Sequence, residues 1–263
     1  MSHNGVQPMQ QTLETQRSIA RAPNGTAFKK VVSLRKPVDS FQDGERLTQK
    51  EFHRRYEKMS EDYCAELIGG IVHVTAAAHH PHSRPLSLIH GLLSRYEAAT
   101  PGVESGIDIT TVLDSETEVQ PDTSLAVSPA YGGKGSDADR YYKHAPELVV
   151  EVSHTTEHID LNEKFRAYEK NNTLEYLVHL VREPAVKWFV LKNGAYELLP
   201  CDKAGVIRSE TFPGLWLNTR ALIKRDLRAM VKTLEKGLAS PEHAAFCKRL
   251  RSTAARIRAG KNQ

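Results

Sequence analysis

The sequence predicts a mixed α/β fold in which helices flank a mixed β-sheet, and three observations support this prediction. Apolar residues fill positions 148–152 without alternation around a single acid, which indicates a strand covered on both faces. Between 83 and 98 apolar residues recur every three or four positions, as on one face of a helix. Strand-like and helix-like segments follow one another without an internal repeat, an order typical of helices packed on a sheet.

The N-terminal third predicts a flexible lead-in, a helix and a hairpin. Residues 1–43 are polar, rich in Gln, Asn and Ser, and lack periodicity, so we expect a flexible extension. A helix is predicted over 48–59, with Thr48 as N-cap and Glu51 as its capping-box partner. Residues 66–74 carry a central Gly-Gly pair, which predicts a β-hairpin with a two-residue turn.

The middle of the chain predicts a loop, a helix and two strands. His79, His80 and His82 surround a proline and are expected in a loop before the helix over 83–98. The apolar positions between 107 and 113 predict one strand. After a turn, a second strand approaches Asp122 through Val119-Gln120-Pro121. We expect these strands to join the same sheet.

The second half predicts a central strand followed by a helix and a meander. The strand covers 146–152, and the next helix carries Asp160 and Lys164. An Asn193-Gly194 pair predicts a turn between two late strands. The remaining elements are strands over 174–181, 186–191 and 196–199, an extended piece over 212–217, and a C-terminal helix.

Composition is that of an ordinary enzyme-sized domain. The chain has 263 residues, of which 40% are hydrophobic and 26% are charged. No apolar run approaches the roughly 20 residues of a membrane helix, and the start lacks the features of a signal peptide. We therefore expect a cytoplasmic protein without a membrane partner. The three cysteines are far apart and have no Cys-x-x-Cys spacing, so they are expected to be reduced thiols.

Charge is distributed unevenly along the chain. From residue 224 onward eleven Lys and Arg face three Asp and Glu, a net charge of +8, which leaves −4 for the rest of the formal +4. A basic tail on an acidic body suits a polyanion such as nucleic acid. A solvated helical end that aids solubility is an equally valid interpretation. The candidate nucleic-acid contacts in this tail are Arg249, Arg251, Arg256 and Arg258.

Two acids next to apolar strand segments are the leading candidates for a metal site. Glu151 lies inside the apolar run at 148–152, and Asp122 precedes the apolar run at 125–127. An ionised carboxylate in such surroundings is costly unless it is paired with a cation or a metal. Hard divalent ions such as Mg²⁺ take oxygen ligands and keep several waters, so two or three carboxylates suffice. Mg²⁺ is the expected cofactor, with Mn²⁺ as a substitute.

The helix after residue 156 brings a lysine toward these acids. Asp160, Lys164 and Tyr168 are four residues apart and share a helix face. If this face looks at Glu151, Lys164 can orient or deprotonate a metal-bound water or stabilise charge on phosphorus, and Asp160 can hold the lysine. An exposed ion pair on an ordinary surface helix is the competing interpretation.

Other candidates have simpler explanations. The histidines at 79–82 have neither helical spacing nor partnering cysteines, which favours a loop over a zinc site. Gly132 to Ser136 lacks the spacing of a phosphate-binding P-loop, so we expect a mobile loop over the site. Glu116 and Glu118 are expected to be solvated.

Seven short motifs in order resemble the bacterial family described as putative restriction endonucleases, formerly a domain of unknown function, in the PD-(D/E)XK superfamily. The resemblance covers roughly residues 44–225 and implies a restriction endonuclease-like fold of the αβββαβ type. By it, Asp122 and Glu151 correspond to the metal-binding acids, Lys164 to the catalytic lysine and Glu66 to an additional acid of the site. The motifs are Glu66-Leu67-Ile68-x-Gly70, His82, Val119-Gln120-Pro121-Asp122, Pro146-x-Leu148-Val149-Val150-Glu151-Val152-Ser153, Asp160-Leu161-x-x-Lys164-x-x-x-Tyr168, Glu175-Tyr176 and Phe212-Pro213-Gly214-Leu215.

The resemblance also implies supporting roles and leaves two functions open. It places His82 near the active edge, with Asp160 and Tyr168 beside the catalytic groups. Ser153 stands where the simplest superfamily pattern has its lysine, so Lys164 is a lysine supplied by the following helix. The expected activity is metal-dependent hydrolysis of phosphodiester bonds, most of all in DNA. The alternative is a nuclease fold that binds nucleic acid or protein without cleaving. A homodimer stays open.

On these grounds the chain divides into a flexible extension over 1–43, a nuclease-like domain over 44–225 and a basic helical tail over 226–263.

Overall fold

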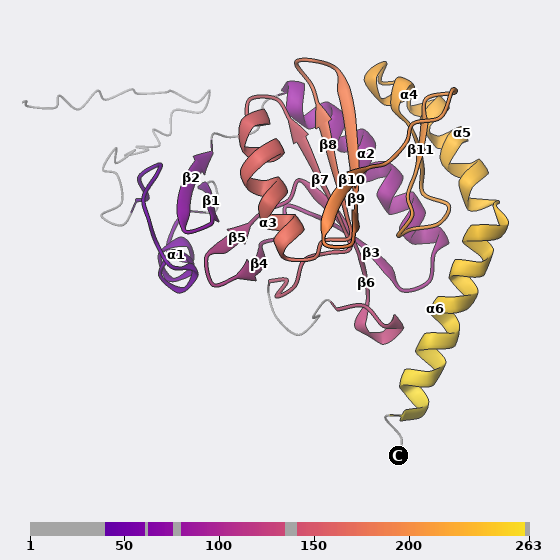
Figure 1. The fold of residues 1–263 in the computed structure, drawn as a ribbon, viewed down its shortest axis with the longest axis horizontal. Helices are drawn as coiled ribbons and strands as arrows, with labels where there is room; N and C mark the ends of the chain where they lie inside the picture. Colours follow the sequence, from indigo (N-terminus) through magenta and orange to yellow (C-terminus); the bar gives the residue numbers. More distant parts are fainter. Residues whose placement is uncertain (1–39, 61–62, 76–79, 135–140, 261–263) are drawn as a thin grey trace, which may run out of the picture. The chain divides into compact units, whose positions relative to one another are not determined.

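The computed structural model describes residues 40–60, 63–75, 80–134 and 141–260. All of them belong to one compact unit, 39–263 (Figure 1). The predicted flexible extension over 1–43 falls outside the described residues up to residue 39. Phe41 is described, and it is buried and stacks on Phe52 with ring centroids 4.7 Å apart. The ordered structure therefore starts a few residues before the predicted domain boundary.

A six-stranded sheet forms the centre of this unit. Its strand order is β10-β9-β8-β7-β6-β3, and of its neighbouring pairs β7 and β8 are parallel while the others are antiparallel. The predicted mixed α/β architecture is thus confirmed. The strands are β3 (Val103–Ile107), β6 (Thr123–Val127), β7 (Leu148–Ser153), β8 (Glu175–Leu180), β9 (Ala185–Lys192) and β10 (Ala195–Leu198).

A second sheet of four strands has the order β2-β1-β5-β4. Gly69 and Gly70 take φ angles of +56° and +77° in the β1-β2 turn, as the Gly-Gly pair predicts. The expectation of one strand over 107–113 in a single sheet is wrong. Asp108 adopts a left-handed φ of +50°, which turns the chain so that β3 and β4 enter different sheets. The strands are β1 (Cys64–Ile68), β2 (Ile71–Thr75), β4 (Thr111–Asp114) and β5 (Thr117–Val119).

Helix α1 (Gln49–Tyr56) packs beside the smaller sheet, and α2 (His80–Ala99) packs on the larger one (Figure 1). The Thr48 hydroxyl accepts a hydrogen bond from the Glu51 amide, which confirms the N-cap. The predicted loop at 79–82 is wrong for 80–82, because α2 begins at His80; residue 79 lies outside the described residues. Pro81 fits this first turn, where its missing N–H would have no helical partner.

Helices cover both faces of the large sheet, and the alternation of β7 decides which side chains meet them. Leu148, Val150 and Val152 pack with α2, whereas Val149 packs with Ala167 and Tyr168 of α3 (Lys164–Lys170). Glu151 has the parity of Val149 and therefore points to the α3 side. A π-helical turn, η2 (Ile159–Glu163), leads directly into α3.

The C-terminal segment continues the same core. Residues Met230, Leu234, Phe246 and Leu250 of the last two helices are buried with the α2 and β7 side chains. The segment predicted as a basic tail over 226–263 is mostly helical in its described part, 226–260, and packs as part of the domain body. Its elements and those preceding it are η1 (Pro129–Tyr131), β11 (Val206–Arg208), β12 (Trp216–Asn218), α4 (Thr219–Ile223), α5 (Leu227–Leu238) and α6 (Pro241–Gly260).

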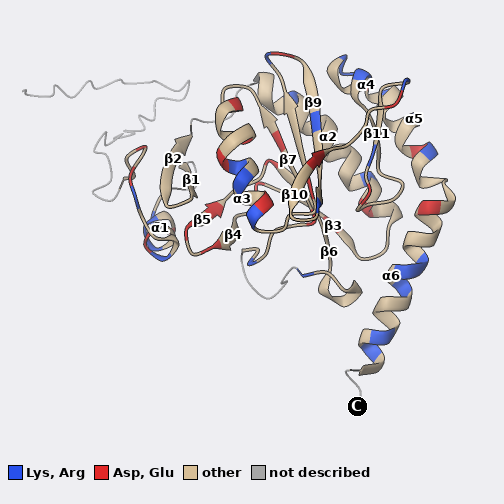
Figure 2. Ribbon diagram, in the orientation of Figure 1, with Lys and Arg blue, Asp and Glu red and all other residues tan. Residues whose placement is uncertain are grey.

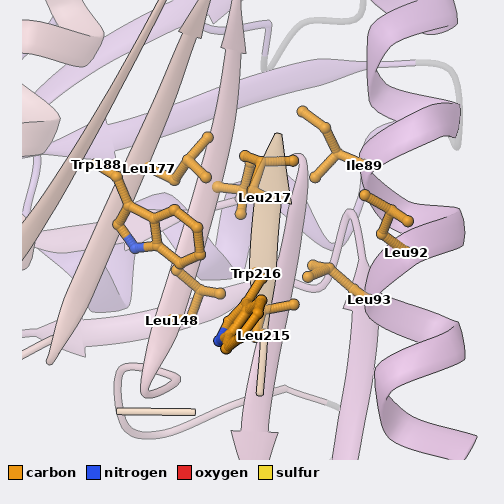
Figure 3. A pocket seen from close by; sticks show the side chains of 10 residues that line it. Ile89, Leu92, Leu93, Leu148, Leu177, Trp188, Leu215, Trp216 and Leu217 are labelled. Atoms are coloured by element: carbon orange, nitrogen blue, oxygen red, sulfur yellow. The ribbon is translucent and has the colours of Figure 1, made fainter. Parts of the chain in front are cut away.

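A small apolar cavity of about 10 Å³ lies in this core between α2 and the sheet (Figure 3). Leu92, Leu177, Trp188 and Leu217 are among the side chains that line it. It is at the lower limit for one water molecule and offers almost no polar lining, so it is a packing gap. In the described part of the chain no helix combines the length and apolarity needed to cross a membrane. Cys201 and Cys247 are free thiols.

Candidate active site

Four distant segments deliver the acids and the lysine that the sequence singles out. Glu66 comes from β1 of the smaller sheet, Asp122 directly precedes β6, Glu151 lies in β7, and Lys164 opens α3. Glu66, Glu151 and Lys164 are 7%, 3% and 5% exposed, respectively. The competing interpretation of Lys164 as part of an exposed surface pair is therefore wrong.

Lys164 joins the two sheets. Its Nζ donates to Oε2 of Glu66 at 2.8 Å and to Oε1 of Glu151 at 3.0 Å. The Tyr168 hydroxyl, one helical turn later, donates to the same Glu151 oxygen at 3.1 Å. These contacts bring Glu66, Glu151, Lys164 and Tyr168 into one buried cluster.

Asp122 is held beside this cluster by the backbone of β7. The antiparallel register pairs Thr123 with Val150, which places Asp122 opposite Glu151 and within reach of the amide that follows Glu151 on β7. Its Oδ2 accepts the Val152 N–H at 2.6 Å and lies 3.0 Å from Nε2 of His82 on α2. The structure thus brings His82 to Asp122, where the resemblance places a histidine.

Gln120 positions Glu66, a role that the sequence did not predict. The Gln120 amide N–H donates to Oε1 of Glu66 at 2.7 Å. The Gln120 side chain is fixed in turn by the hydroxyls of Tyr56 and Thr110, at 3.1 and 3.0 Å. Position 120 lies in the motif before Asp122, which is the signal that could have identified it.

Asp160 does not hold the lysine as expected. Its Oδ2 accepts the Thr156 hydroxyl at 2.6 Å, one turn earlier, while Lys164 has two acceptors on the strands. Asp160 is nonetheless buried at 2% exposure and acts on the cluster through its charge. The π-helical turn between Asp160 and Lys164 is a local irregularity of the kind frequent at functional sites.

The cluster carries an excess of negative charge. Burial raises the pKa of Glu151 well above its ordinary value, and Asp122, Asp160 and Glu66 raise it further, while Lys164 opposes them. Burial also raises the pKa of Asp160. Four carboxyl groups therefore share one lysine and one histidine, which is an environment that favours a further cation.

The two basic groups respond to this charge. For Lys164 the largest single effect, burial, lowers the pKa, but the carboxylates of Glu151, Glu66 and Asp160 together outweigh it and raise the pKa above the ordinary lysine value. The hydrogen bond to Asp122 raises the pKa of His82. Lys164 is therefore an ammonium at neutral pH.

The donor chemistry fits a hard divalent cation held by Asp122 and Glu151. The hydrogen bonds of Asp122 end on Oδ2 and those of Glu151 end on Oε1, so within the described residues the second oxygen of each carboxylate receives none. Across these same residues no group of three or more His, Cys, Asp or Glu side chains is arranged to hold a metal ion. Two carboxylates with waters completing the shell are a common Mg²⁺ arrangement.

Asp108 is a further acid near the site that the sequence reasoning missed. Its φ is +50°, and its pKa is raised first by partial desolvation of the carboxyl group and then by the charge of Asp122. Its influence on Asp122 depends on the turn between the two sheets. No sequence pattern at 107–113 reveals that turn.

Other predicted candidates lie away from the site. Gly132 lies next to Thr253 of α6, past the end of β6 that is farther from Asp122. The described part of the loop expected over the active site, residues 132–134, therefore does not cover the site. Residues 135–136 lie outside the described residues. Glu118 is buried instead of solvated, because Gln49 and His53 donate to it at 2.7 and 2.8 Å. The predicted nucleic-acid contacts Arg249, Arg251, Arg256 and Arg258 are exposed on α6.

Comparison with known proteins identifies the family of this chain. No curated protein matches the chain. The solved structures include a crystal structure described as a putative nuclease belonging to DUF820 from Anabaena variabilis, which shares the fold with a TM-score of 0.55 and 13% sequence identity over 68% of this chain and 98% of that one. The model of the Uma2 family, described as "Putative restriction endonuclease", matches residues 49–220. The chain therefore belongs to the Uma2 family.

Proposed function

We propose that this protein is a metal-dependent endonuclease of the PD-(D/E)XK type that hydrolyses phosphodiester bonds in DNA. The observation that supports this most is the convergence of Glu66, Glu151 and Lys164 in one buried cluster with surplus negative charge, with Asp122 held beside it on the Val152 amide. A domain that only binds DNA has no physical need for clustered acids, which repel the phosphate backbone.

Asp122 and Glu151 would hold Mg²⁺, or Mn²⁺ in its place, through their second oxygens. Such an ion, when bound, neutralises the scissile phosphate and lowers the pKa of a bound water. The His82 imidazole and the Val152 amide fix one Asp122 oxygen, and Tyr168 fixes one oxygen of Glu151. Each acid is thereby oriented before a ligand arrives.

Lys164 acts as a charged donor in this proposal. Because its raised pKa keeps it protonated at neutral pH, it suits orienting a water or stabilising charge on a phosphate oxygen, and it does not suit accepting a proton. Glu66 positions the ammonium from the opposite sheet. The family and the acid cluster support DNA as substrate.

Nicking of supercoiled plasmid tests the proposal. Wild type, Asp122→Asn and Glu116→Gln would be incubated with Mg²⁺, Mn²⁺ or EDTA. Glu116 is an exposed acid in the turn before β5 and serves as a control of equal charge change. We expect nicking in Mg²⁺ or Mn²⁺ by wild type and Glu116→Gln, and a loss of at least about 100-fold in Asp122→Asn.

Two results would contradict the proposal. Nicking that persists in EDTA would remove the metal from the reaction. Duplex binding without nicking in either metal would instead favour the module that binds without cleaving, for which the Lys164 bridge between Glu66 and Glu151 would be a permanent structural link.

A further inference from the structure

The outer face of α6 is a basic surface outside the family domain. The family match ends at residue 220, whereas α6 spans Pro241–Gly260. Residues 243–260 contain no Asp or Glu, and Figure 2 shows Lys and Arg along this helix. The basic side chains of this surface are Lys248, Arg249, Arg251, Arg256 and Arg258, all exposed.

Helical spacing arranges four of these arginines in two rows. Arg249 and Arg256 are seven residues apart on one flank, and Arg251 and Arg258 repeat that spacing on the other. Two turns of helix separate the members of each row by about 10 Å. Between the rows the helix exposes mostly small residues, namely Ala245, Ser252, Ala255 and Ala259.

The inner face of α6 fixes these rows to the domain. Phe246, Leu250 and Ala254 are buried, and the His243 imidazole lies 2.9 Å from the Thr100 hydroxyl and 2.9 Å from the Leu238 carbonyl oxygen. α6 is therefore a helix packed against the domain. Two of its arginines contact residues of the same helix. The Arg249 guanidinium lies over the Phe246 ring, 4.9 Å from its centroid, and the Arg256 guanidinium donates to the Thr253 hydroxyl at 3.3 Å. Neither contact neutralises the charge.

α6 lies at the opposite end of β6 from the candidate active site. Asp122 precedes β6, and η1, against which α6 packs, follows it. The six residue steps from Asp122 to Ser128 span roughly 20 Å of extended chain. A duplex that reaches both places must therefore extend at least about six base pairs, at roughly 3.4 Å each, beyond the bond at the active site.

We propose that the outer face of α6 is a sequence-independent anchor for duplex DNA, which holds backbone phosphates at least about 20 Å from the site of cleavage. The choice of DNA as the occupant rests on the proposed function. The arginines and Lys248 suit phosphates by charge, while the other residues between the rows are small and offer no long polar side chain for reading bases. An anionic membrane is disfavoured, because this face presents no large apolar side chain to insert.

Fluorescence anisotropy with a duplex of about 30 base pairs tests the anchor. Binding would be measured in EDTA over a series of salt concentrations. The variant Arg251→Gln/Arg256→Gln/Arg258→Gln removes three charges from α6, and Arg228→Gln/Lys232→Gln/Lys236→Gln removes three exposed charges from α5 as a matched control. Glutamine keeps a high helix propensity, so both variants should fold, as thermal melting would verify.

We expect the α6 variant to lose at least about tenfold in affinity and to flatten the slope of log affinity against log salt by about 2 to 3, since each lost phosphate contact contributes about 0.9. The α5 control should lose less than threefold. Equal losses in the two variants would overturn the anchor. So would tighter binding of the wild type to vesicles of anionic lipid than to the duplex.

The design separates this proposal from the proposed function. Wild type that binds duplex through α6 but nicks in neither metal overturns the endonuclease and leaves the anchor intact. An α6 variant that binds like wild type overturns the anchor, whether or not the plasmid is nicked.

Discussion

At the scale of single residues, Lys164 neutralises a cluster that would otherwise repel itself. One ammonium contacts Glu66 and Glu151, while Asp160 and Asp122 add their charges from nearby. Removing one partner of a buried pair leaves an uncompensated charge, which typically costs about 3–5 kcal/mol. The charge of Lys164 is therefore a stability determinant as well as a catalytic candidate.

Replacing Lys164 with methionine should lower stability in a pH-dependent way. Burial already raises the pKa of Glu151 in the folded protein, and the Lys164 ammonium opposes this increase. Loss of the ammonium should therefore raise the pKa of Glu151 further. A carboxyl with a raised folded pKa stabilises below its unfolded value, near about 4.3, and this contribution is lost as pH rises through the folded value. We expect Lys164→Met to unfold at lower urea than wild type at pH 8, with a smaller deficit at pH 5.

Lys170→Met is the matched control for this experiment. Lys170 is exposed on α3, the helix that also carries Lys164, and its Nζ lies 2.9 Å from Oδ2 of Asp114 on β4. Its loss should change the urea midpoint little at either pH. A Lys164→Met deficit that is equal at pH 5 and pH 8 would show that the carboxylates do not set the cost.

The site residues were largely predictable because they are side chains in recognisable patterns. An acid within an apolar strand identified Glu151, and the order of short motifs identified Glu66 and Lys164. The resemblance pointed to His82, but the second partner of Asp122 was not predictable, because it is the Val152 backbone amide, which every residue type but proline supplies. The hydrogen bond from the Thr156 hydroxyl to Asp160, which replaces the expected contact with Lys164, could not be predicted from the residue types alone.

At the scale of elements, the strands were easier to predict than their assignment to sheets. The apolar run of β7 indicated coverage on both faces, and α2 and α3 provide it. The division into two sheets depends on a left-handed residue, Asp108, between β3 and β4. Asp tolerates that conformation without requiring it, so its type alone carries little information.

The contact between α5 and the segment 212–215 is an element junction that should be sensitive to an added methyl group. A Cβ at Gly237 would lie 2.1 Å from the Gly214 carbonyl oxygen and 2.8 Å from Trp216. We expect Gly237→Ala to destabilise by about 1–3 kcal/mol in chemical denaturation, although alanine favours helix formation.

Gly91→Ala in α2 is the opposite case. A Cβ at this exposed helix position meets nothing within 4 Å, so the variant should gain up to about 1 kcal/mol from helix propensity. Destabilisation of both variants by the same amount would mean that steric contact at the α5 junction is not the cause.

At the scale of the whole molecule, the helices beyond the family match complete the core. Their large apolar side chains are buried against α2 and the six-stranded sheet, in the same cluster as Leu148 and Val150. The solvated tail was predicted from the positive charges of this segment, and the helical spacing of Met230, Val231 and Leu234, which indicates a buried face, was not taken into account. Packing on one face and charge on the other coexist in α6.

Ending the chain after residue 226 should therefore abolish the folded state as well as any anchoring. Burial of Met230, Leu234, Phe246 and Leu250 is worth roughly 1.5–3 kcal/mol each, and their sum is comparable to the about 5–15 kcal/mol that holds a typical domain together. We expect this truncation to lose its cooperative thermal transition. A chain ending at residue 255 removes no buried position among the described ones and should melt near wild type. A cooperative, unshifted transition in the shorter chain would mean that residues 44–225 fold alone, with α5 and α6 as an appendage.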